Sequence, residues 1–229
     1  MIKRELYMNR IRPFIGGELI KVMTGIRRSG KSVMLELIKE ELAEAGVAPS
    51  QMISINFEDM RYSHLQTATA LHDEIIKRAE GIEGKAYLFF DEIQEVEGWE
   101  KCVNSLRVAL DCDMYITGSN AKLLSGELAT YIGGRYVEFV IYPFSFAEFL
   151  ELYHTIAPSD SIQQCFQKYL LAGGMPYLAN LRYEEEPSRQ YLTDLFNSVQ
   201  LKDIVKRNKI RDIDLLERII AYMTANVGT

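Results

Sequence analysis

Cysteine and histidine are scarce in this sequence, with three of each among 229 residues. Cys102, Cys112 and Cys165 form no CxxC pair, and no histidine stands at a metal-ligand spacing from another histidine or from a cysteine. An odd, scattered set of cysteines argues against a disulfide framework and against a zinc site of the usual spacing. We therefore expect buried thiols in a reducing compartment.

Long hydrophobic runs are absent as well. No segment approaches the roughly 18 consecutive apolar residues that mark a membrane-spanning helix. Residues 1–7 (Met-Ile-Lys-Arg-Glu-Leu-Tyr) contain no apolar core of the kind found in a signal peptide. These absences predict a soluble, cytoplasmic protein with no membrane segment.

Neither sign of charge dominates the chain. Lys and Arg total 26 and Asp and Glu total 32, so the net charge is −6. This balance argues against a protein whose whole surface grips nucleic acid, but it leaves a local basic patch open. Hydrophobic residues make up 48% of the chain, which is enough for a packed globular core.

What the sequence does contain is a regular alternation of strand and helix patterns between residues 19 and 142. Short apolar runs typical of buried strands occupy residues 19–24, 52–57, 87–90, 114–117 and 136–142. Helical spacing of apolar residues covers residues 31–45, 67–80 and 99–110 between them. Alternation of this kind predicts an α/β fold, in which helices cover both faces of a parallel sheet.

The pattern changes after Pro143. Four further segments have helical periodicity, at residues 145–153, 161–171, 188–206 and 213–226. Pro187 and Asp212 are suitable starting residues for the last two. We therefore divide the chain into an α/β domain, residues 1–150, and a helical region, residues 151–229.

A glycine-rich motif joins the first predicted strand to the first predicted helix. Residues 25–32 (Gly-Ile-Arg-Arg-Ser-Gly-Lys-Ser) fit the phosphate-loop pattern G-x-x-x-x-G-K-[ST], and this context favours a phosphate loop over a plain turn. Glycines let the backbone approach a phosphate, and the loop and helix N–H groups then surround it. The lysine supplies charge for the β- and γ-phosphates, and the last serine a hydroxyl for Mg²⁺. The predicted nucleotide-binding residues are Gly25, Ile26, Arg27, Arg28, Ser29, Gly30, Lys31, Ser32 and Val33.

An acidic pair ends the apolar run at residues 87–90. Ligands of open α/β sheets bind at the carboxyl ends of the strands, so Asp91 and Glu92 should lie beside the phosphate loop. Asp91 is then a candidate ligand of Mg²⁺ together with Ser32, and Glu92 a candidate general base for the attacking water. The alternative is an acidic pair that merely ends a strand. With a phosphate loop upstream, the pair favours hydrolysis.

Three other polar features have two interpretations each. A polar side chain of residues 117–120 (Thr-Gly-Ser-Asn), after the fourth predicted strand, positions water near the γ-phosphate, or Ser119 or Asn120 caps the next helix. Arg135, on a glycine hinge before the fifth strand, either neutralises charge on the transferring phosphoryl group or lies on the surface. Arg27 and Arg28 in the loop either reach phosphate or face solvent.

Taken together, these motifs resemble the bacterial and archaeal AAA+-like P-loop ATPases that carry an uncharacterised C-terminal domain. The resemblance spans nearly the whole chain. It rests on the Arg-Arg-containing loop at 25–32, Asp-Glu-Ile-Gln at 91–94 with Trp99 after it, Thr-Gly-Ser at 117–119, Gly-Arg at 134–135, Tyr-Pro-Phe-Ser-Phe at 142–146 and Gly-Gly-Met-Pro at 173–176. Met175 stands where the family has an aromatic residue.

The resemblance implies a sheet with strand order 5-1-4-3-2 and helices that lead into a winged-helix-like region. It supports Lys31, Ser32, Asp91 and Glu92 in the roles given above. It also implies Ser119 as a sensor and Arg135 as an arginine finger. It names ATP, with Mg²⁺, as the nucleotide. Family members are longer, so residues 151–229 are expected to begin a C-terminal domain that continues past Thr229.

The function most consistent with these residues is ATP hydrolysis that drives a conformational change between the sheet domain and the helical region. An alternative is an ATP-dependent signalling switch or scaffold with little turnover, assembled as a homo-oligomer through Arg135. A kinase is less favoured, because no arginine-bearing lid is visible. DNA association stays open because a local basic cluster contains Lys202, Lys206, Arg207, Lys209 and Arg211.

Overall fold

The computed structural model describes residues 2–118, 132–199, 205, 210 and 212–227. The chain divides into two compact units, Met1–Ala179 and Asn180–Thr229. The first unit contains the sheet and every candidate site residue that the structure describes.

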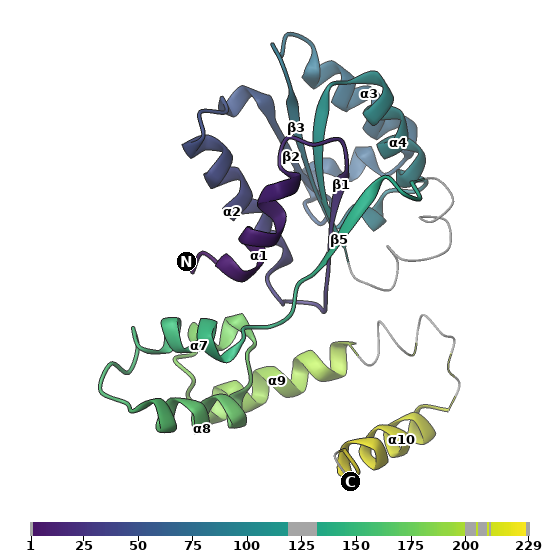
Figure 1. Ribbon diagram of the computed structural model, residues 1–229. Coiled ribbons are helices and arrows are strands. Elements are labelled where there is room, and N and C mark those ends of the chain that lie inside the picture. The colour runs from purple at the N-terminus through teal and green to yellow at the C-terminus, as the bar shows by residue number, and fades with distance from the viewer. Residues whose placement is uncertain (1, 119–131, 200–204, 206–209, 211, 228–229) are drawn as a thin grey trace. The chain divides into compact units, whose positions relative to one another are not determined.

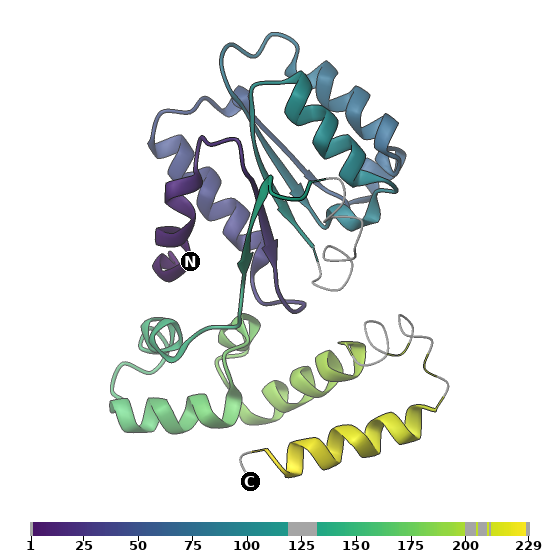
Figure 2. The same ribbon diagram turned by 45° about the vertical axis from the view of Figure 1, so that its right-hand side comes forward.

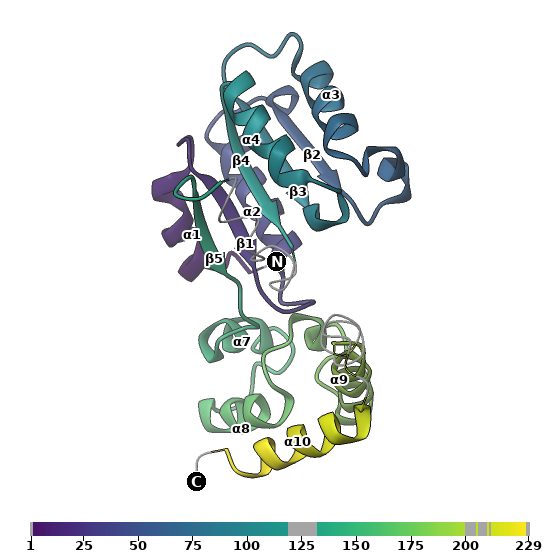
Figure 3. The same cartoon turned by 90° about the vertical axis from the view of Figure 1, so that its right-hand side faces the viewer.

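Five parallel strands form one sheet in the first unit, in the order β2-β3-β4-β1-β5 (Figure 3). The same order counted from the other edge is 5-1-4-3-2, so the predicted α/β fold and strand order are confirmed. The strands are β1 (Ile20–Thr24), β2 (Met52–Asn56), β3 (Ala86–Asp91), β4 (Cys112–Thr117) and β5 (Tyr136–Val140).

Helices cover both faces of the sheet, with α1 and α2 on one face and α3 and α4 on the other (Figure 1). Among the residues that the structure describes, the α-helices of the first unit are α1 (Glu5–Ile11), α2 (Lys31–Glu44), α3 (Ala68–Ala79), α4 (Trp99–Ala109), α7 (Phe146–Tyr153) and α8 (Ile162–Ala172). Its short 3-10 helices are η1 (Arg12–Phe14), η2 (Pro49–Gln51), η3 (Met60–Leu65), η4 (Ile93–Glu95) and η5 (Pro176–Ala179).

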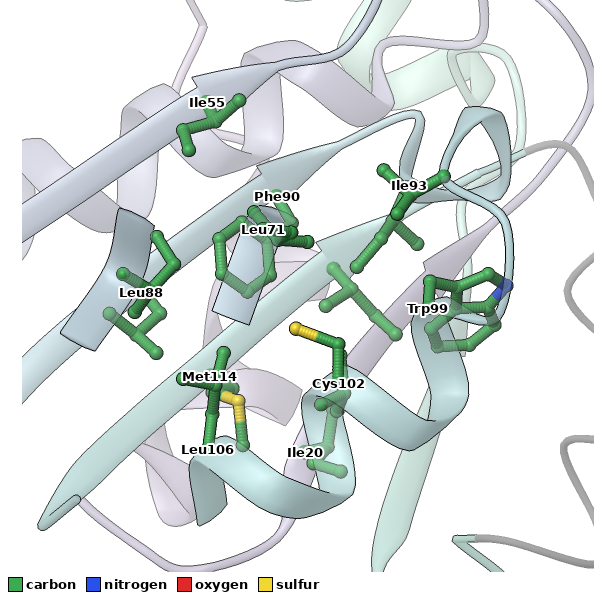
Figure 4. Close-up of a cluster of buried hydrophobic side chains, with 14 of the residues drawn as sticks. Ile20, Ile55, Leu71, Leu88, Phe90, Ile93, Trp99, Cys102, Leu106 and Met114 are labelled. Atoms are coloured by element: carbon green, nitrogen blue, oxygen red, sulfur yellow. The ribbon is translucent and has the colours of Figure 1, made fainter. Parts of the chain in front are cut away.

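The larger hydrophobic core lies between the sheet and helices α3 and α4. The apolar face of each helix packs against every second residue of the strands. Side chains of a strand alternate between the two faces of the sheet, and apolar residues of a helix recur every 3 to 4 positions. Leu71 of α3 and Leu106 of α4 are fully buried in this core, and Leu106 lies beside Met114 of β4 (Figure 4). Cys102 is also buried here, and all three cysteines are buried and unpaired as expected.

The second core lies on the other face, against α1 and α2. Phe89 and Tyr115 stack on neighbouring strands, with ring centroids 4.9 Å apart. Met34 of α2 and Ile11 of α1 pack in the same cluster. The sequence did not predict α1, but its buried residues show that it is part of the core.

A buried ion pair joins β1 to β4 on this face. The ammonium of Lys21 contacts the carboxylate of Asp113, and both side chains are fully buried. The second carboxylate oxygen of Asp113 accepts hydrogen bonds from the Tyr115 hydroxyl at 2.7 Å and from the Gly16 N–H at 2.6 Å. Burial lowers the pKa of Lys21, and the charge of Asp113 opposes that shift.

Helices α7 and α8 belong to the first compact unit, and Figure 2 shows how β5 leads into α7. Capping boxes at Ser145 and Ser161 start the two helices. The chain after β5 is tied back to α8 and its following turn, because Tyr169 donates to the Phe144 carbonyl at 2.9 Å and the Phe144 N–H donates to the Gly174 carbonyl at 2.7 Å. The sequence assigned most of this segment to region 151–229, and a domain boundary near residue 150 stays a prediction.

The second unit contains helices α9 (Glu185–Val199) and α10 (Ile213–Ala225). Asp212 caps α10 by accepting a hydrogen bond from the Leu215 N–H at 2.8 Å, as its position before the helix predicted. Pro187 lies within the first turn of α9. A winged-helix-like arrangement stays a prediction. Within the described ranges, no helix has both the length and the apolar character to cross a membrane.

Candidate functional site

The register of the sheet brings the polar ends of three strands to one edge. Asn56, the last residue of β2, pairs with Asp91, the last residue of β3. Met23 of β1 pairs with Thr117, the last residue of β4. Because all strands are parallel, the loop that leaves β1 begins at this same edge.

That loop turns sharply between β1 and α2. Gly25, Arg28 and Gly30 have φ angles of 144°, 62° and 103°, which reverse the chain without regular secondary structure. Helix α2 begins at Lys31, directly after its N-cap residue Gly30. Because glycine has no side chain, it forms no side-chain hydrogen bond to the first N–H groups of the helix. A loop of this shape with a helix N-terminus behind it is a suitable cradle for phosphate.

Gly25 is required by contact as well as by conformation. A Cβ atom at this position would lie 2.2 Å from the Ile141 carbonyl oxygen and 3.0 Å from Ser29 Oγ. The backbone of Ile141 is fixed there, because its N–H donates to the Thr24 carbonyl at 2.7 Å. The loop therefore packs its backbone directly against the chain that leaves β5.

Lys31 is buried at the mouth of the loop. Its Nζ donates to the carbonyl oxygens of Gly25 and Ile26, both at 3.2 Å, and lies 3.9 Å from Glu92 Oε1. Burial lowers the pKa of Lys31, and the carboxylates of Glu92 and Asp91 oppose that shift. The buried ammonium of Lys31 thus lies where the phosphate-loop motif is expected to bind a phosphate.

Asp91 is fixed by hydrogen bonds from both neighbouring strands. Its Oδ1 accepts from the Thr117 hydroxyl, and its Oδ2 accepts from the Asn56 side-chain amide at 3.0 Å. Thr117 Oγ1 in turn accepts from the Glu92 N–H at 3.0 Å. Asn56 was not predicted as a site residue, and Thr117 was named only as part of the polar segment 117–120. Each is a polar residue that ends a strand next to β3.

Glu92 leaves β3 in a left-handed conformation, with φ 55° and ψ 47°. Such a conformation is unfavourable for a residue with a side chain and is concentrated at functional sites. The Gln94 amide donates to the Glu92 carboxylate. Burial raises the pKa of Glu92, and the hydrogen bond from Gln94 and the charge of Lys31 partly offset this. A raised pKa brings the carboxyl closer to the range in which a general base is effective.

The structure brings together some of the predicted residues and not others. Lys31, Asp91 and Glu92 converge at the sheet edge. Ser32 and Val33 are exposed on the first turn of α2, as is Ile26 in the loop. Predicted residues Ser119 and Asn120 lie outside the described residues, as do all members of the basic cluster at 202–211.

Arg135 lies at the opposite end of the strands. Its carbonyl accepts from the N–H of Ile20, the first residue of β1, whereas the phosphate-loop motif follows the last residue of β1. Its guanidinium donates to Asn104 of α4 at 2.9 Å. Arg135 is therefore not part of the cluster formed by Lys31 and Glu92 in the same chain.

A five-stranded parallel sheet in this order, with a glycine-rich loop between β1 and α2, defines the fold of an AAA+ P-loop NTPase, which supports nucleotide binding. The family model described as an AAA domain matches residues 18–150, and the chain belongs to that family. A second model, described as a domain of unknown function, matches residues 163–229.

Two curated relatives are similar to this chain in sequence, and one solved structure is similar to it in fold. An uncharacterised protein of Haemophilus influenzae is 40% identical over all of this chain and 56% of its own length. An uncharacterised protein of Methanocaldococcus jannaschii is 33% identical over 90% of this chain and 47% of its own length. The chain thus spans about half the length of the curated relatives it matches. AMPPCP-bound DnaA from Aquifex aeolicus superimposes with a TM-score of 0.52 at 12% identity, covering 99% of this chain and 70% of that one, which supports the fold.

Proposed function

We propose that this protein binds ATP with Mg²⁺ at residues 25–33 and hydrolyses it, with Glu92 as the general base. The observation that carries the proposal is the approach of Lys31 and Glu92 to 3.9 Å at the mouth of the loop. A cation suited to bind phosphate and a carboxylate with a raised pKa are thus side by side, which supports binding of a γ-phosphate next to a general base for water.

The loop supplies the binding part of this activity. Backbone N–H groups of the loop and the start of α2 hold the phosphates, and Lys31 exchanges its contacts with the Gly25 and Ile26 carbonyls for phosphate oxygens. The donor set fits Mg²⁺, which prefers oxygen ligands and takes few from the protein: the Ser32 hydroxyl and the Asp91 carboxylate. When bound, Mg²⁺ neutralises charge on the β- and γ-phosphate oxygens.

Glu92 supplies the catalytic part. Its ionised carboxylate accepts a proton from the attacking water. Thr117 accepts a hydrogen bond from the Glu92 N–H and donates one to Asp91, and these two bonds hold the backbone of Glu92 in position. Ser119 stays a candidate sensor. Product formation releases the γ-phosphate contacts of the loop, which we propose as the origin of a conformational change between the α/β domain and the helical region.

Arg135 enters the proposal only as a residue of a second subunit. It lies at the end of β5 remote from the loop of its own chain, so it stabilises a transferring phosphoryl group only in a homo-oligomer. Arginine fingers supplied by a neighbouring subunit accelerate phosphoryl transfer about 10³–10⁵-fold.

Lys31→Ala tests the proposal, with Lys39→Ala as the matched control on the same helix. Lys39 interacts with Glu36 at 2.7 Å and with Ser54 at 3.4 Å, away from the loop motif. We expect Lys31→Ala to abolish binding of a fluorescent ATP analogue and release of phosphate, while Lys39→Ala keeps both. Equal binding by wild type and Lys31→Ala would refute the proposal.

A second candidate is a nucleotide-dependent switch or scaffold with little turnover. The hydrogen bond from Gln94 to the Glu92 carboxylate favours it, since this bond occupies the group that would activate water. A chain that binds ATP tightly but hydrolyses it no faster than Glu92→Gln would support this candidate. Turnover well above that of Glu92→Gln would exclude it.

DNA association is a separate proposal that rests on the basic cluster at residues 202–211. A salt titration of binding to a DNA duplex tests it. Where Lys or Arg contacts phosphate, the logarithm of the binding constant falls linearly with the logarithm of the salt concentration. Binding that does not respond to salt would contradict it.

A further inference from the structure

Arg4 is a buried arginine that contacts the backbone of the candidate nucleotide loop. Only 3% of its surface is exposed. Its Nη1 donates to the Ser29 carbonyl at 2.9 Å, and its Nη2 donates to the Tyr142 carbonyl at 2.9 Å. Its Nε donates to Glu148 Oε1 at 2.8 Å. One side chain thus joins the loop, the segment after β5 and helix α7.

The surroundings hold the guanidinium in one place. Its Cζ lies 4.6 Å from the ring centroid of Tyr7 and 5.1 Å from that of Phe144. A Cβ atom on Gly30 would lie 3.3 Å from Nη1 of Arg4, so the loop and the guanidinium are in close packing. Arg4 itself has a left-handed backbone, with φ 46° and ψ 48°, directly before α1. An unfavourable backbone angle here is maintained by the contacts that the side chain makes.

The hydrogen bond to Ser29 determines which way one loop peptide faces. The peptide between Ser29 and Gly30 is trans, so its carbonyl and its N–H point in opposite directions. Because the Ser29 carbonyl points toward the guanidinium of Arg4, the Gly30 N–H points away from it. That is the direction from which a phosphate would be bound by backbone N–H groups.

We infer that Arg4 is a positioning residue for nucleotide binding, and that it links the phosphate loop to helix α7. The inference rests on the proposed function of the loop. Arg4 precedes the residues matched by the family model, which begin at residue 18. Glu148 forms an ion pair with Arg4 and also forms the capping box of α7 with Ser145. A displacement of the start of α7 would therefore displace the guanidinium of Arg4, which contacts the loop.

The geometry requires arginine rather than any cation. Its fork donates in three directions at once, to two carbonyls and a carboxylate, whereas a lysine ammonium on a flexible stem does not reproduce this arrangement. Because Glu148 balances the charge, the contribution of Arg4 to the loop is orientation and not long-range attraction of phosphate. Arg4→Lys should therefore recover only part of the function.

The test compares Arg4→Ala and Arg4→Lys with Arg12→Ala in the full 229-residue chain. Arg12 is the control, since it pairs with Glu5 at 2.7 Å and with Glu41 at 2.9 Å, and neither partner belongs to the loop. Loss of a hydrogen bond from a charged donor corresponds to about a tenfold or larger change in an equilibrium constant. We expect Arg4→Ala to weaken binding of a fluorescent ATP analogue by about that factor, Arg4→Lys by less, and Arg12→Ala by under about twofold.

Two further measurements separate positioning from general destabilisation. Arg4→Ala should raise KM for ATP more than it lowers kcat at saturating ATP, since bound nucleotide restores the loop. Thermal unfolding without nucleotide should show that Arg12→Ala also loses stability while keeping its affinity. If Arg4→Ala does not fold, Arg4→Lys is compared with Glu148→Gln, which keeps the Arg4 bond to Ser29 and should bind nucleotide more tightly than Arg4→Lys.

The outcomes distinguish this inference from the proposed function. If wild type binds nucleotide, Lys31→Ala does not, and Arg4→Ala binds like wild type, the role of Arg4 is refuted alone. Affinity losses in Arg4→Ala and Arg12→Ala that simply follow their losses in unfolding temperature would also refute it. If wild type and Lys31→Ala bind equally, the proposed function fails and the inference fails with it.

Discussion

Lys31 Nζ lies 3.9 Å from Glu92 Oε1, although one residue begins α2 and the other follows β3. Each charge stabilises the other, while burial disfavours both. A bound phosphate would compete with Glu92 for the same ammonium. Nucleotide binding is therefore expected to free the Glu92 carboxylate at the moment at which a water-activating group is needed.

Glu92→Gln should keep nucleotide binding and lose hydrolysis. The amide is nearly the same shape as the carboxylate but accepts no proton, and general-base catalysis contributes about 10²–10⁴-fold to a rate. Phosphate release and titration with a fluorescent ATP analogue measure the two effects. Glu97→Gln, at an exposed position shortly after it in the chain, is the control and should leave turnover unchanged. Equal turnover in Glu92→Gln and wild type would exclude Glu92 as the base.

The pH dependence of kcat/KM should reflect the raised pKa of Glu92. The carboxylate acts as a base only when ionised, so activity should rise with pH and reach its plateau above the ordinary range of a glutamate. The hydrogen bond from Gln94 lowers this pKa by favouring the ionised form. Gln94→Leu should therefore move the acidic limb to higher pH, whereas Gln66→Leu at an exposed position should not. A shift of the limb to lower pH in Gln94→Leu would contradict this assignment.

Lys21→Met should destabilise the fold without any direct effect on the site. It leaves the buried Asp113 carboxylate without its counter-charge, which costs about 3–5 kcal/mol in comparable pairs. Lys21→Met combined with Asp113→Asn should recover part of this, since the amide oxygen still accepts from Tyr115 and Gly16. Urea denaturation measures the free energy of unfolding.

The control for this prediction is the exposed pair of Lys85 and Asp111, whose charged atoms are 2.7 Å apart. Lys85→Met should cost less than about 1 kcal/mol, because solvent screens such pairs. Equal losses in Lys21→Met and Lys85→Met would contradict the importance of burial for the Lys21 pair.

Gly25→Ala should disrupt the loop far more than Gly46→Ala. At Gly25 a methyl group meets the Ile141 carbonyl oxygen at 2.2 Å, whereas at Gly46 no atom lies within 4 Å and only the positive φ is unfavourable. We expect losses in unfolding free energy of about 3 kcal/mol and about 1 kcal/mol, respectively. Nucleotide affinity should fall in Gly25→Ala alone. Retained affinity in Gly25→Ala would show that the loop tolerates displacement from Ile141.

Mixing two inactive variants tests whether Arg135 acts between subunits. Glu92→Gln keeps its Arg135, and Arg135→Ala keeps its Glu92, so a mixed oligomer contains some sites with both groups. We expect the mixture to hydrolyse ATP faster than either variant alone, and wild-type specific activity to rise with protein concentration. Activity of Arg135→Ala equal to that of wild type would remove Arg135 from the mechanism.

The sheet could be predicted because its signals are local. Short apolar runs, with helical patterns between them, predicted the bounds of all five strands to within a few residues. The family resemblance predicted the order of the strands in the sheet. The loop at 25–32 and the acidic pair could be recognised because each motif is contiguous in the chain. Asn56 and Thr117 could not be assigned to the site in this way, since their bonds to the acidic pair arise from the register of neighbouring strands.

Arg4 illustrates why the remaining contacts could not be predicted from the sequence. Its partners Ser29 and Glu148 are 25 and 144 residues away, and nothing in its local sequence distinguishes it from Lys3. Helix α1 is only seven residues long, too short for a clear apolar period. The grouping of α7 with the sheet has the same origin, because it depends on bonds between distant segments and not on composition.

The polar contacts of β4 have a consequence for how reliably the sheet assembles. Side chains alternate between the two faces of a strand, so a slip of β4 by one residue would turn Asp113 toward the apolar core near α4 and separate Thr117 from Asp91. Apolar neighbours alone would tolerate such an error, since most of β4 is hydrophobic on both sides. An unpaired charge buried among hydrocarbon makes the misaligned sheet much less stable than the aligned one. The residues that fix the strand alignment during folding thus include Thr117, which also holds the acidic pair in place.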